Sequence, residues 1–222
     1  MATIELKAAD GHVLSAYEVR PEGAGAAVVI IQEIFGVNPH IRSVVDRYAA
    51  HGYHVVAPAL FDRAERGVEL EYTPEGVQEG LALRGRIPWE DTMADVAAAV
   101  ERVSATGPVA VIGYCFGGSV AWRAAHSLPV AAAVGYYGGA IAEFIDEEPR
   151  VPVMLHFGSE DQSIPPSVAE EVRRRHPRVE VHVYEGAGHG FNCDARESFA
   201  PEAAALAERR TLEFLARSGV NP

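Results

Sequence analysis

The stretch that decides the fold reads Val-Ala-Val-Ile-Gly-Tyr-Cys-Phe-Gly-Gly and spans residues 109–118. Its apolar start is typical of a strand buried on both faces. Gly113 and Gly117 stand two residues before and two after Cys115, which keeps Cβ atoms out of a tight turn between strand and helix. This context predicts that Cys115 projects from a nucleophile elbow, at a helix N-terminus that favours thiolate. On the motif alone, a small buried cysteine in a glycine-rich turn is an equally good interpretation.

On both sides of this stretch, expected strands and helices alternate. Apolar runs predict strands at residues 13–17, 26–31, 54–58, 109–113, 130–136, 153–157 and 179–184. Helical spacing predicts helices at residues 41–50, 91–104, 117–127, 167–176 and 201–216. Such alternation predicts an α/β fold with a mostly parallel central sheet and helices on both faces.

Two local expectations follow from the same pattern. In the helix at residues 91–104, the expected inner positions are Ala94, Val96, Ala97, Val100 and Val103. Residues 61–89 interrupt the alternation with charges, glycine and proline, and we expect a connection or a cap over a site there. Residues 1–222 are therefore predicted to form one domain.

Composition and charge exclude several classes of protein. The net charge of −12 argues against a nucleic-acid or anionic-lipid partner, because Lys and Arg must neutralise phosphates. The start of the chain has no apolar signal region, and no apolar stretch approaches the roughly 20 residues of a membrane helix. We therefore expect a cytoplasmic monomer with no membrane partner. Two cysteines, Cys115 and Cys193, are too few to staple this fold, and both are expected as free thiols.

Two further residues follow later strands in the order that α/β-hydrolases use for nucleophile, acid and histidine. Asp161 comes just after the strand at residues 153–157, and His189 lies among glycines after the strand at residues 179–184. We interpret Cys115, Asp161 and His189 as a catalytic triad. In isolation, a turn cap before Pro165 is the better interpretation of Asp161. Four other histidines are expected to be packing or surface residues, namely His51, His54, His156 and His182.

The loop at residues 32–38 follows the buried strand at residues 26–31. In this fold, that loop and the residue after the nucleophile each donate one oxyanion-hole N–H. The candidates are the backbone N–H groups of Ile34 and Phe116. Glu33 at the strand end is either a residue of the site or a solvent-facing carboxylate. The chain has no dinucleotide fingerprint, phosphate-binding loop or zinc pattern, so neither cofactor nor metal is predicted.

Four motifs together resemble the dienelactone hydrolase family. They are Gln-Glu-Ile-Phe-Gly-Val-Asn at residues 32–38, Gly-Tyr-Cys-Phe-Gly-Gly at 113–118, Gly-Tyr-Tyr-Gly at 135–138 and Gly-His-Gly-Phe at 188–191. The resemblance covers roughly residues 26–216. It implies an α/β-hydrolase fold with a Cys-Asp-His triad. It also implies that Glu33 contacts the resting thiol and takes part in forming thiolate. From the third motif, we count Tyr137 among the substrate-binding residues.

The chain departs from the family where the substrate carboxylate is held. The resemblance implies two arginines, one of them four residues after the histidine, and Cys193 stands at that position. Arg84 or Arg86 is a candidate for the other arginine. Loss of a bidentate carboxylate partner favours a neutral ester or another lactone over dienelactone. A separate hypothesis is that Cys193 forms a disulfide with Cys115 under oxidation.

The sequence therefore predicts a hydrolase of a small-molecule lactone or ester. The thiol of Cys115 attacks the carbonyl and gives a thioester acyl-enzyme. His189, oriented by Asp161, moves protons and activates water. One alternative is a broad carboxylesterase or thioesterase. The other is a catalytically silent α/β-hydrolase that binds a ligand.

Overall fold

A computed structural model describes residues 2–222, which fall into two compact units. The first unit holds residues up to Val109 together with Val220–Pro222, and the second holds Ala110–Gly219. Each unit has its own strands and covering helices. The single domain over residues 1–222 stays a prediction.

The first unit contains four strands. They are β1 (Ala2–Lys7), β2 (Val13–Val19), β3 (Ala27–Ile31) and β4 (His54–Pro58). Strand β2 pairs antiparallel with β1 and with β4, while β3 and β4 are parallel. Every residue of β3 and β4 is buried, as their continuous apolar runs predict. Strand β1 was not predicted, because only Leu6 of this polar strand is buried and no apolar pattern marks it.

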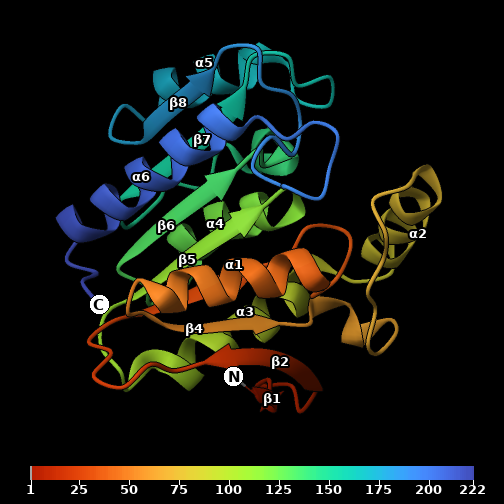
Figure 1. Cartoon of the computed structure of the whole chain (residues 1–222), viewed down its shortest axis with the longest axis vertical. Coiled ribbons are helices and arrows are strands. Elements are labelled where there is room, and N and C mark those ends of the chain that lie inside the picture. Colours follow the sequence, from red (N-terminus) through yellow and green to blue (C-terminus); the bar gives the residue numbers. More distant parts are fainter. Residues whose placement is uncertain (1) are drawn as a thin grey trace. The chain divides into compact units, whose positions relative to one another are not determined.

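Two helices of the first unit, α1 (Pro39–Ala50) and α3 (Trp89–Ser104), pack on β3 and β4. Figure 1 shows α1 in front of these strands and α3 behind them. Helix α1 begins two residues earlier than predicted because Asn38 caps it. The Asn38 side chain accepts a hydrogen bond from the Ile41 N–H at 3.1 Å, and Pro39 occupies the first helical position.

The buried face of α3 differs in part from the predicted one. Val96, Val100 and Val103 are buried as expected, but Ala94 and Ala97 are only half-buried. Asp95 takes an inner position instead, because the Arg63 guanidinium binds both of its carboxylate oxygens at 2.8 Å. An ion pair with two hydrogen bonds lets a carboxylate occupy a position that polarity alone assigns to the surface.

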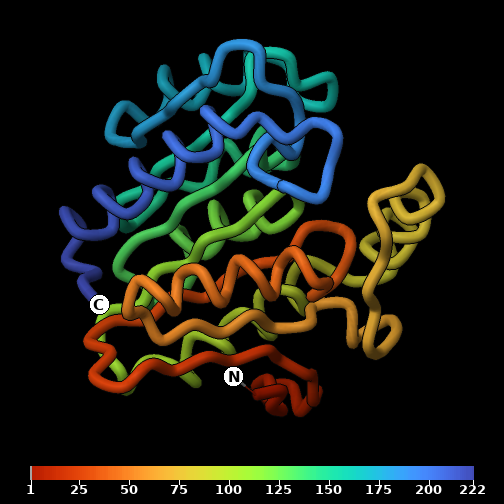
Figure 2. Tube along the Cα trace, in the orientation of Figure 1, coloured from red at the N-terminus to blue at the C-terminus, as the bar shows by residue number. Residues whose placement is uncertain are grey.

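The connection at residues 61–89 contains helices that its composition did not predict. A short 3-10 helix, η1 (Leu60–Arg63), is followed by helix α2 (Pro74–Gly85). Figure 2 shows this segment as an excursion from the four strands of the first unit. Helix α2 lies close to the loop after β3 at Gly80, where an added Cβ would lie 2.0 Å from the Ile34 carbonyl oxygen. Only glycine allows α2 to rest on the Ile34 backbone at this distance.

The second unit contains four parallel strands in the order β5-β6-β7-β8. They are β5 (Val109–Tyr114), β6 (Ala132–Tyr136), β7 (Val153–Gly158) and β8 (Glu180–Tyr184). Their helices are α4 (Phe116–Ser127), the 3-10 helix η2 (Gly139–Phe144), α5 (Pro166–Arg175) and α6 (Pro201–Arg217). Helix α4 packs on β6 and α6 packs on β7, with α6 in front of the strands and α4 behind them in Figure 1.

Taken together, the strand pairings are mostly parallel, with antiparallel pairing confined to the pairs of β2 with β1 and β4, and helices cover both faces of the strands in each unit; the predicted α/β class is confirmed. The carboxyl ends of β5, β7 and β8 lead directly into the segments that carry Cys115, Asp161 and His189. No helix among residues 2–222 combines the length and the apolar character needed to span a membrane.

Candidate active site

Cys115 lies in a strained turn between β5 and α4. It caps α4 with φ 54° and ψ −115°, a conformation that costs free energy in a residue with a Cβ. Its backbone N–H donates to the Tyr136 carbonyl at 3.0 Å. A Cβ on Gly113 would lie 1.8 Å from the Gly117 carbonyl oxygen, so the turn closes only without that side chain. The geometry is that of the predicted elbow.

His189 contacts both other members of the predicted triad. Its Nε2 lies 3.2 Å from the Cys115 sulfur, and its Nδ1 lies 2.8 Å from Oδ2 of Asp161. The other carboxylate oxygen of Asp161 accepts the backbone N–H groups of Ser163 and Ile164 at 2.8 and 3.1 Å. These two bonds fix the carboxylate and leave Oδ2 for the imidazole.

The environment of this chain of contacts stabilises a charged imidazole. The side chain of Asp161 is fully buried, and that of His189 is 19% exposed. Burial works against the imidazolium of His189, but the bonds to Asp161 and Cys115 outweigh it and raise the pKa of His189 to about 10. The raised pKa favours the protonated ring, in which an Nδ1–H faces Asp161 and an Nε2–H faces the sulfur. Such an arrangement can hold a proton beside a sulfur nucleophile and deliver it to a leaving group.

Tyr137 lies beside this imidazole. It follows β6 with φ 40°, again left-handed for a residue with a side chain, and it is completely buried. Its ring centroid is 5.1 Å from that of His189 and 5.5 Å from that of Phe191. The structure therefore brings Tyr137 to the predicted triad, while its substrate contact stays a prediction.

The loop after His189 carries Cys193, which is fully buried. The N–H of Cys193 donates to the Gly190 carbonyl at 2.8 Å, and the Arg196 N–H donates to the Cys193 carbonyl at 3.1 Å. These turns fold the chain back, so that the Arg196 guanidinium packs on Gly190. Both cysteines are free thiols. The predicted roles of Cys193 in substrate binding and in a disulfide remain untested.

The remaining predicted residues of the elbow and its oxyanion hole divide between the units. Phe116 is the first residue of α4, where backbone N–H groups point out of the helix end. Ile34 belongs to the first unit and is buried. That the backbone N–H groups of Ile34 and Phe116 together form an oxyanion hole stays a prediction.

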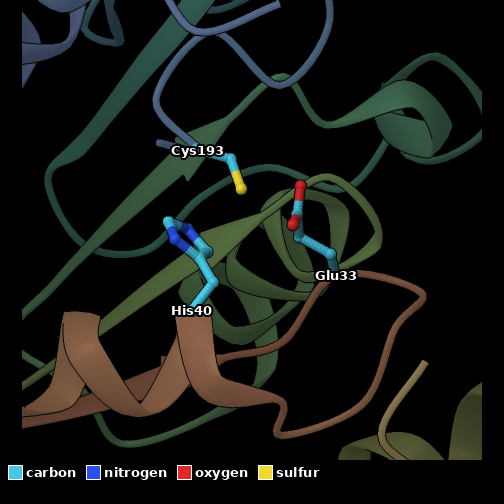
Figure 3. Close-up of side chains that lie close together, drawn as sticks. All are labelled: Glu33, His40 and Cys193. Atoms are coloured by element: carbon cyan, nitrogen blue, oxygen red, sulfur yellow. The ribbon is translucent and has the colours of Figure 1, made fainter. Parts of the chain in front are cut away.

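Glu33 is fully buried at the end of β3, which excludes the solvent-facing interpretation. Tyr72 donates its hydroxyl to Oε2 of Glu33 at 2.9 Å, and its ring packs on Phe35 with centroids 4.5 Å apart. His40 of α1 brings a ring nitrogen within 4.8 Å of a Glu33 carboxylate oxygen. Figure 3 shows both side chains rising from the backbone of the first unit; Cys193, also labelled there, belongs to the second unit.

Sequence reasoning missed Tyr72 and His40 as neighbours of Glu33. His40 follows the Asn-Pro pair that starts α1, so its position on the first turn was readable from the helix start signal. Tyr72 lies in the connecting segment, whose irregular composition gives no periodicity from which a contact could be inferred. Its pairing with Glu33 depends on tertiary structure alone.

The two candidate arginines make contacts within their own segment. The Arg84 guanidinium lies 4.0 Å from the centroid of the Trp89 ring and donates to the Ile87 carbonyl at 2.7 Å. Arg86 is exposed and donates to the Ala64 carbonyl at 2.9 Å. Neither contact requires a ligand, and a carboxylate-binding role for either arginine stays a prediction.

Known proteins resemble this chain over most of its length. The dienelactone hydrolase family model matches residues 14–219. The carboxymethylenebutenolidase of Pseudomonas putida is 34% identical over 224 residues, with 96% of this chain and 95% of that protein covered. Carboxymethylenebutenolidase 1 of Cupriavidus pinatubonensis is 32% identical with the same coverage of both chains.

Solved structures give the same assignment. A Klebsiella pneumoniae protein assigned as a dienelactone hydrolase is 30% identical, with a TM-score of 0.82 over 97% of this chain and 99% of that chain. The esterase Pf2001 of Pyrococcus furiosus is 19% identical and shares the fold, with a TM-score of 0.70 over 97% of this chain and 91% of that chain. These similarities confirm the α/β-hydrolase fold, and the chain belongs to the dienelactone hydrolase family.

Proposed function

We propose that this protein hydrolyses a lactone or an activated ester through a thioester on Cys115. Membership of the family makes the chain a hydrolase of the dienelactone hydrolase type. The observation that carries the finer proposal is the contact of one imidazole with both the Cys115 sulfur and the Asp161 carboxylate. A turn-capping aspartate or a packing cysteine has no need of that shared partner.

In the proposed reaction, the Cys115 sulfur attacks the substrate carbonyl and forms a carbon–sulfur bond. The carbonyl electrons move onto oxygen, where the Phe116 N–H, and by the family resemblance that of Ile34, stabilise the negative charge. Loss of one such donor typically costs ~10²–10³ in rate. The ester carbon–oxygen bond then breaks, and the Nε2 proton of His189 goes to the departing oxygen.

The second half of the reaction returns the enzyme to its starting state. Neutral His189 takes a proton from water, and the resulting hydroxide attacks the thioester carbonyl. Collapse of the intermediate releases the acid and the Cys115 sulfur. The Asp161 carboxylate stabilises the imidazolium at both stages and fixes the ring orientation. By the same resemblance, Glu33 assists formation of the thiolate.

For the substrate, we propose a neutral or weakly charged lactone or ester. The name of the P. putida relative denotes a butenolide that carries a carboxymethylene group. In this chain, a buried thiol at Cys193 stands where the family resemblance places a carboxylate-binding arginine. A thiol offers neither the charge nor the bidentate geometry of a guanidinium, and this favours substrates without a carboxylate.

The test compares hydrolysis rates of p-nitrophenyl acetate, the cis and trans dienelactones, and uncharged lactones of similar size. We expect the Cys115→Ala variant to be inactive on all of them and the wild type to prefer the uncharged substrates in kcat/KM. Turnover that survives in Cys115→Ala would refute the cysteine mechanism. A preference for a dienelactone that is lost in Arg84→Ala or Arg86→Ala would refute the substrate proposal. Inactivity of the wild type on every substrate would favour a silent binding protein.

A further inference from the structure

A continuous chain of polar side chains lies inside the second unit, away from the cysteine. The Thr211 hydroxyl of α6 is 2.8 Å from the Tyr136 hydroxyl and 3.0 Å from Nε2 of His156. The other ring nitrogen of His156 is 2.8 Å from the Tyr184 hydroxyl. Thr211 and His156 are fully buried, and the two tyrosines are nearly so. Burial lowers the pKa of His156 well below 6.5, so its ring is neutral, with one donor and one acceptor nitrogen.

The neutral ring allows every bond of this chain to form at once. If each hydroxyl donates to its neighbour in one direction, His156 accepts at one nitrogen and donates at the other. Removal of one hydroxyl leaves buried groups unpaired on both sides of the gap, which is costly in a dry interior. The Thr211 hydroxyl is the link between Tyr136 and His156, so its loss breaks the chain in the middle.

Each strand residue of this hydrogen-bonded network lies next to a segment that carries or contacts a residue of the predicted triad. Tyr136 ends β6 and precedes Tyr137, whose ring contacts that of His189. His156 lies in β7, which leads to Asp161, and its carbonyl accepts the Tyr137 N–H at 2.7 Å.

Tyr184 joins the two loops that carry the acid and the imidazole. It ends β8, and its carbonyl oxygen accepts the Ser159 N–H at 2.9 Å and the Ala187 N–H at 3.3 Å. The Ala187 carbonyl in turn accepts the Glu160 N–H at 2.9 Å. A displacement of Tyr184 therefore moves the segment before Asp161 and the segment before His189 together.

Three tyrosines, Tyr136, Tyr137 and Tyr184, surround the ring of Phe191, which lies two residues after His189. The Phe191 ring is completely buried, with its centroid 5.1 Å from Tyr184, 5.5 Å from Tyr137 and 6.4 Å from Tyr136. Tyr136 is held over His156 with ring centroids 4.4 Å apart. The polar chain thus fixes two of the three rings that anchor the His189 loop.

We propose that Thr211 is a remote positioning residue, whose hydroxyl holds the His156 and tyrosine network that places His189 between Asp161 and Cys115. Thr211 touches neither substrate nor triad and acts only through the network. The inference rests on the proposed function for its kinetic consequence. Its structural consequence, the placement of the His189 ring, is measurable without catalysis.

The experiment compares Thr211→Val, which removes the hydroxyl at constant size, with Thr211→Ser, which keeps it. Thr92→Val is the matched control, because Thr92 is a buried helical threonine of the first unit whose hydroxyl donates to the Pro88 carbonyl. All assays are made well below the unfolding midpoint of each variant. We expect Thr211→Val to lower kcat roughly tenfold with KM within twofold, and Thr211→Ser and Thr92→Val to stay within threefold of the wild type.

The second readout is the NMR resonance of the His189 Nδ1 proton, identified by its loss in His189→Gln. We expect it to shift or broaden in Thr211→Val and to return in Thr211→Ser. An unchanged resonance and unchanged kcat in a destabilised Thr211→Val would overturn the proposal and leave Thr211 a purely structural residue. A Thr211→Ser variant whose kcat and His189 resonance change as much as those of Thr211→Val would also overturn the proposal. If the wild type hydrolyses none of the substrates, the resonance of the His189 Nδ1 proton still tests the positioning role. If Thr211→Val does not fold, Tyr184→Phe takes its place, because it removes the other hydrogen bond of the His156 ring.

Discussion

Replacement of Asp161 by asparagine tests how much the buried carboxylate contributes to the chemistry. In Asp161→Asn, the amide oxygen can keep the N–H groups of Ser163 and Ile164, so the fold of the loop is retained. The amide nitrogen then faces Nδ1 of His189, where it can donate but not accept. The imidazole is therefore forced into the tautomer that carries its proton on Nε2, and it loses the charge that stabilised its protonated form.

The size of the effect follows from the charge state of His189. Its pKa is about 10 against an ordinary value of 6.5, and this difference corresponds to roughly 5 kcal/mol. Burial opposes the shift, and the bond to Asp161 is the largest contribution that raises it. If half or more of the difference comes from Asp161, the variant loses about 2–3 kcal/mol in the second half-reaction, in which neutral His189 becomes charged, and kcat falls roughly 100-fold.

The assay is steady-state hydrolysis of p-nitrophenyl acetate at pH 7, with the concentration of folded protein checked by circular dichroism. Asp146→Asn, the same change at an exposed carboxylate that pairs with Arg175, is the control and should match the wild type. A kcat of Asp161→Asn within threefold of the wild type would refute the argument. It would show that Asp161 is a turn cap with no part in catalysis.

Three further predictions concern the elbow, the imidazole and the first unit. Gly113→Ala should lower the unfolding free energy in urea by about 3 kcal/mol or more, because its Cβ would lie 1.8 Å from the Gly117 carbonyl oxygen; an unchanged midpoint would contradict the elbow geometry. Since the pKa of His189 is raised to about 10, its stabilising contribution should be complete below pH 6.5 and lost as the pH rises through 10. Urea titrations of the wild type and His189→Gln should therefore converge at high pH, and a constant gap would argue against the raised pKa. Arg63→Leu should lower the free energy of unfolding in urea by about 3–5 kcal/mol, since it leaves the fully buried Asp95 without its partner. A decrease below about 1 kcal/mol would show that the ion pair contributes little to stability.

The sequence predicts the elbow and its partners because local rules determine them. The turn at Cys115 brings Gly113 so close to the Gly117 carbonyl oxygen that a Cβ does not fit. This requirement can be seen in the sequence as glycines two residues before and two after the cysteine. Asp161 and His189 follow apolar strands, and parallel strands of one sheet bring their carboxyl ends to the same edge. The boundaries of β4 and the buried character of β3 are equally direct consequences of continuous apolar runs.

Features that depend on pairing between distant residues could not be predicted in this way. Asp95 looks like a surface residue of α3 until Arg63 is placed beside it. Helix α2 has little amphipathic pattern because few of its residues are buried, and it was assigned to an irregular connection. His156 was interpreted as a packing or surface histidine. It is buried, but its bonds to Thr211 and Tyr184 join segments whose contact no periodicity reveals.

The central claim is that Cys115 carries the acyl group during turnover. The most direct measurement is mass spectrometry of protein quenched in acid during steady-state hydrolysis of p-nitrophenyl acetate, followed by peptide mapping. We predict an acetyl adduct on the peptide that contains Cys115, which neutral hydroxylamine removes as expected of a thioester and which is absent from Cys115→Ala. An adduct confined to another residue, or full turnover by Cys115→Ala, would contradict the account.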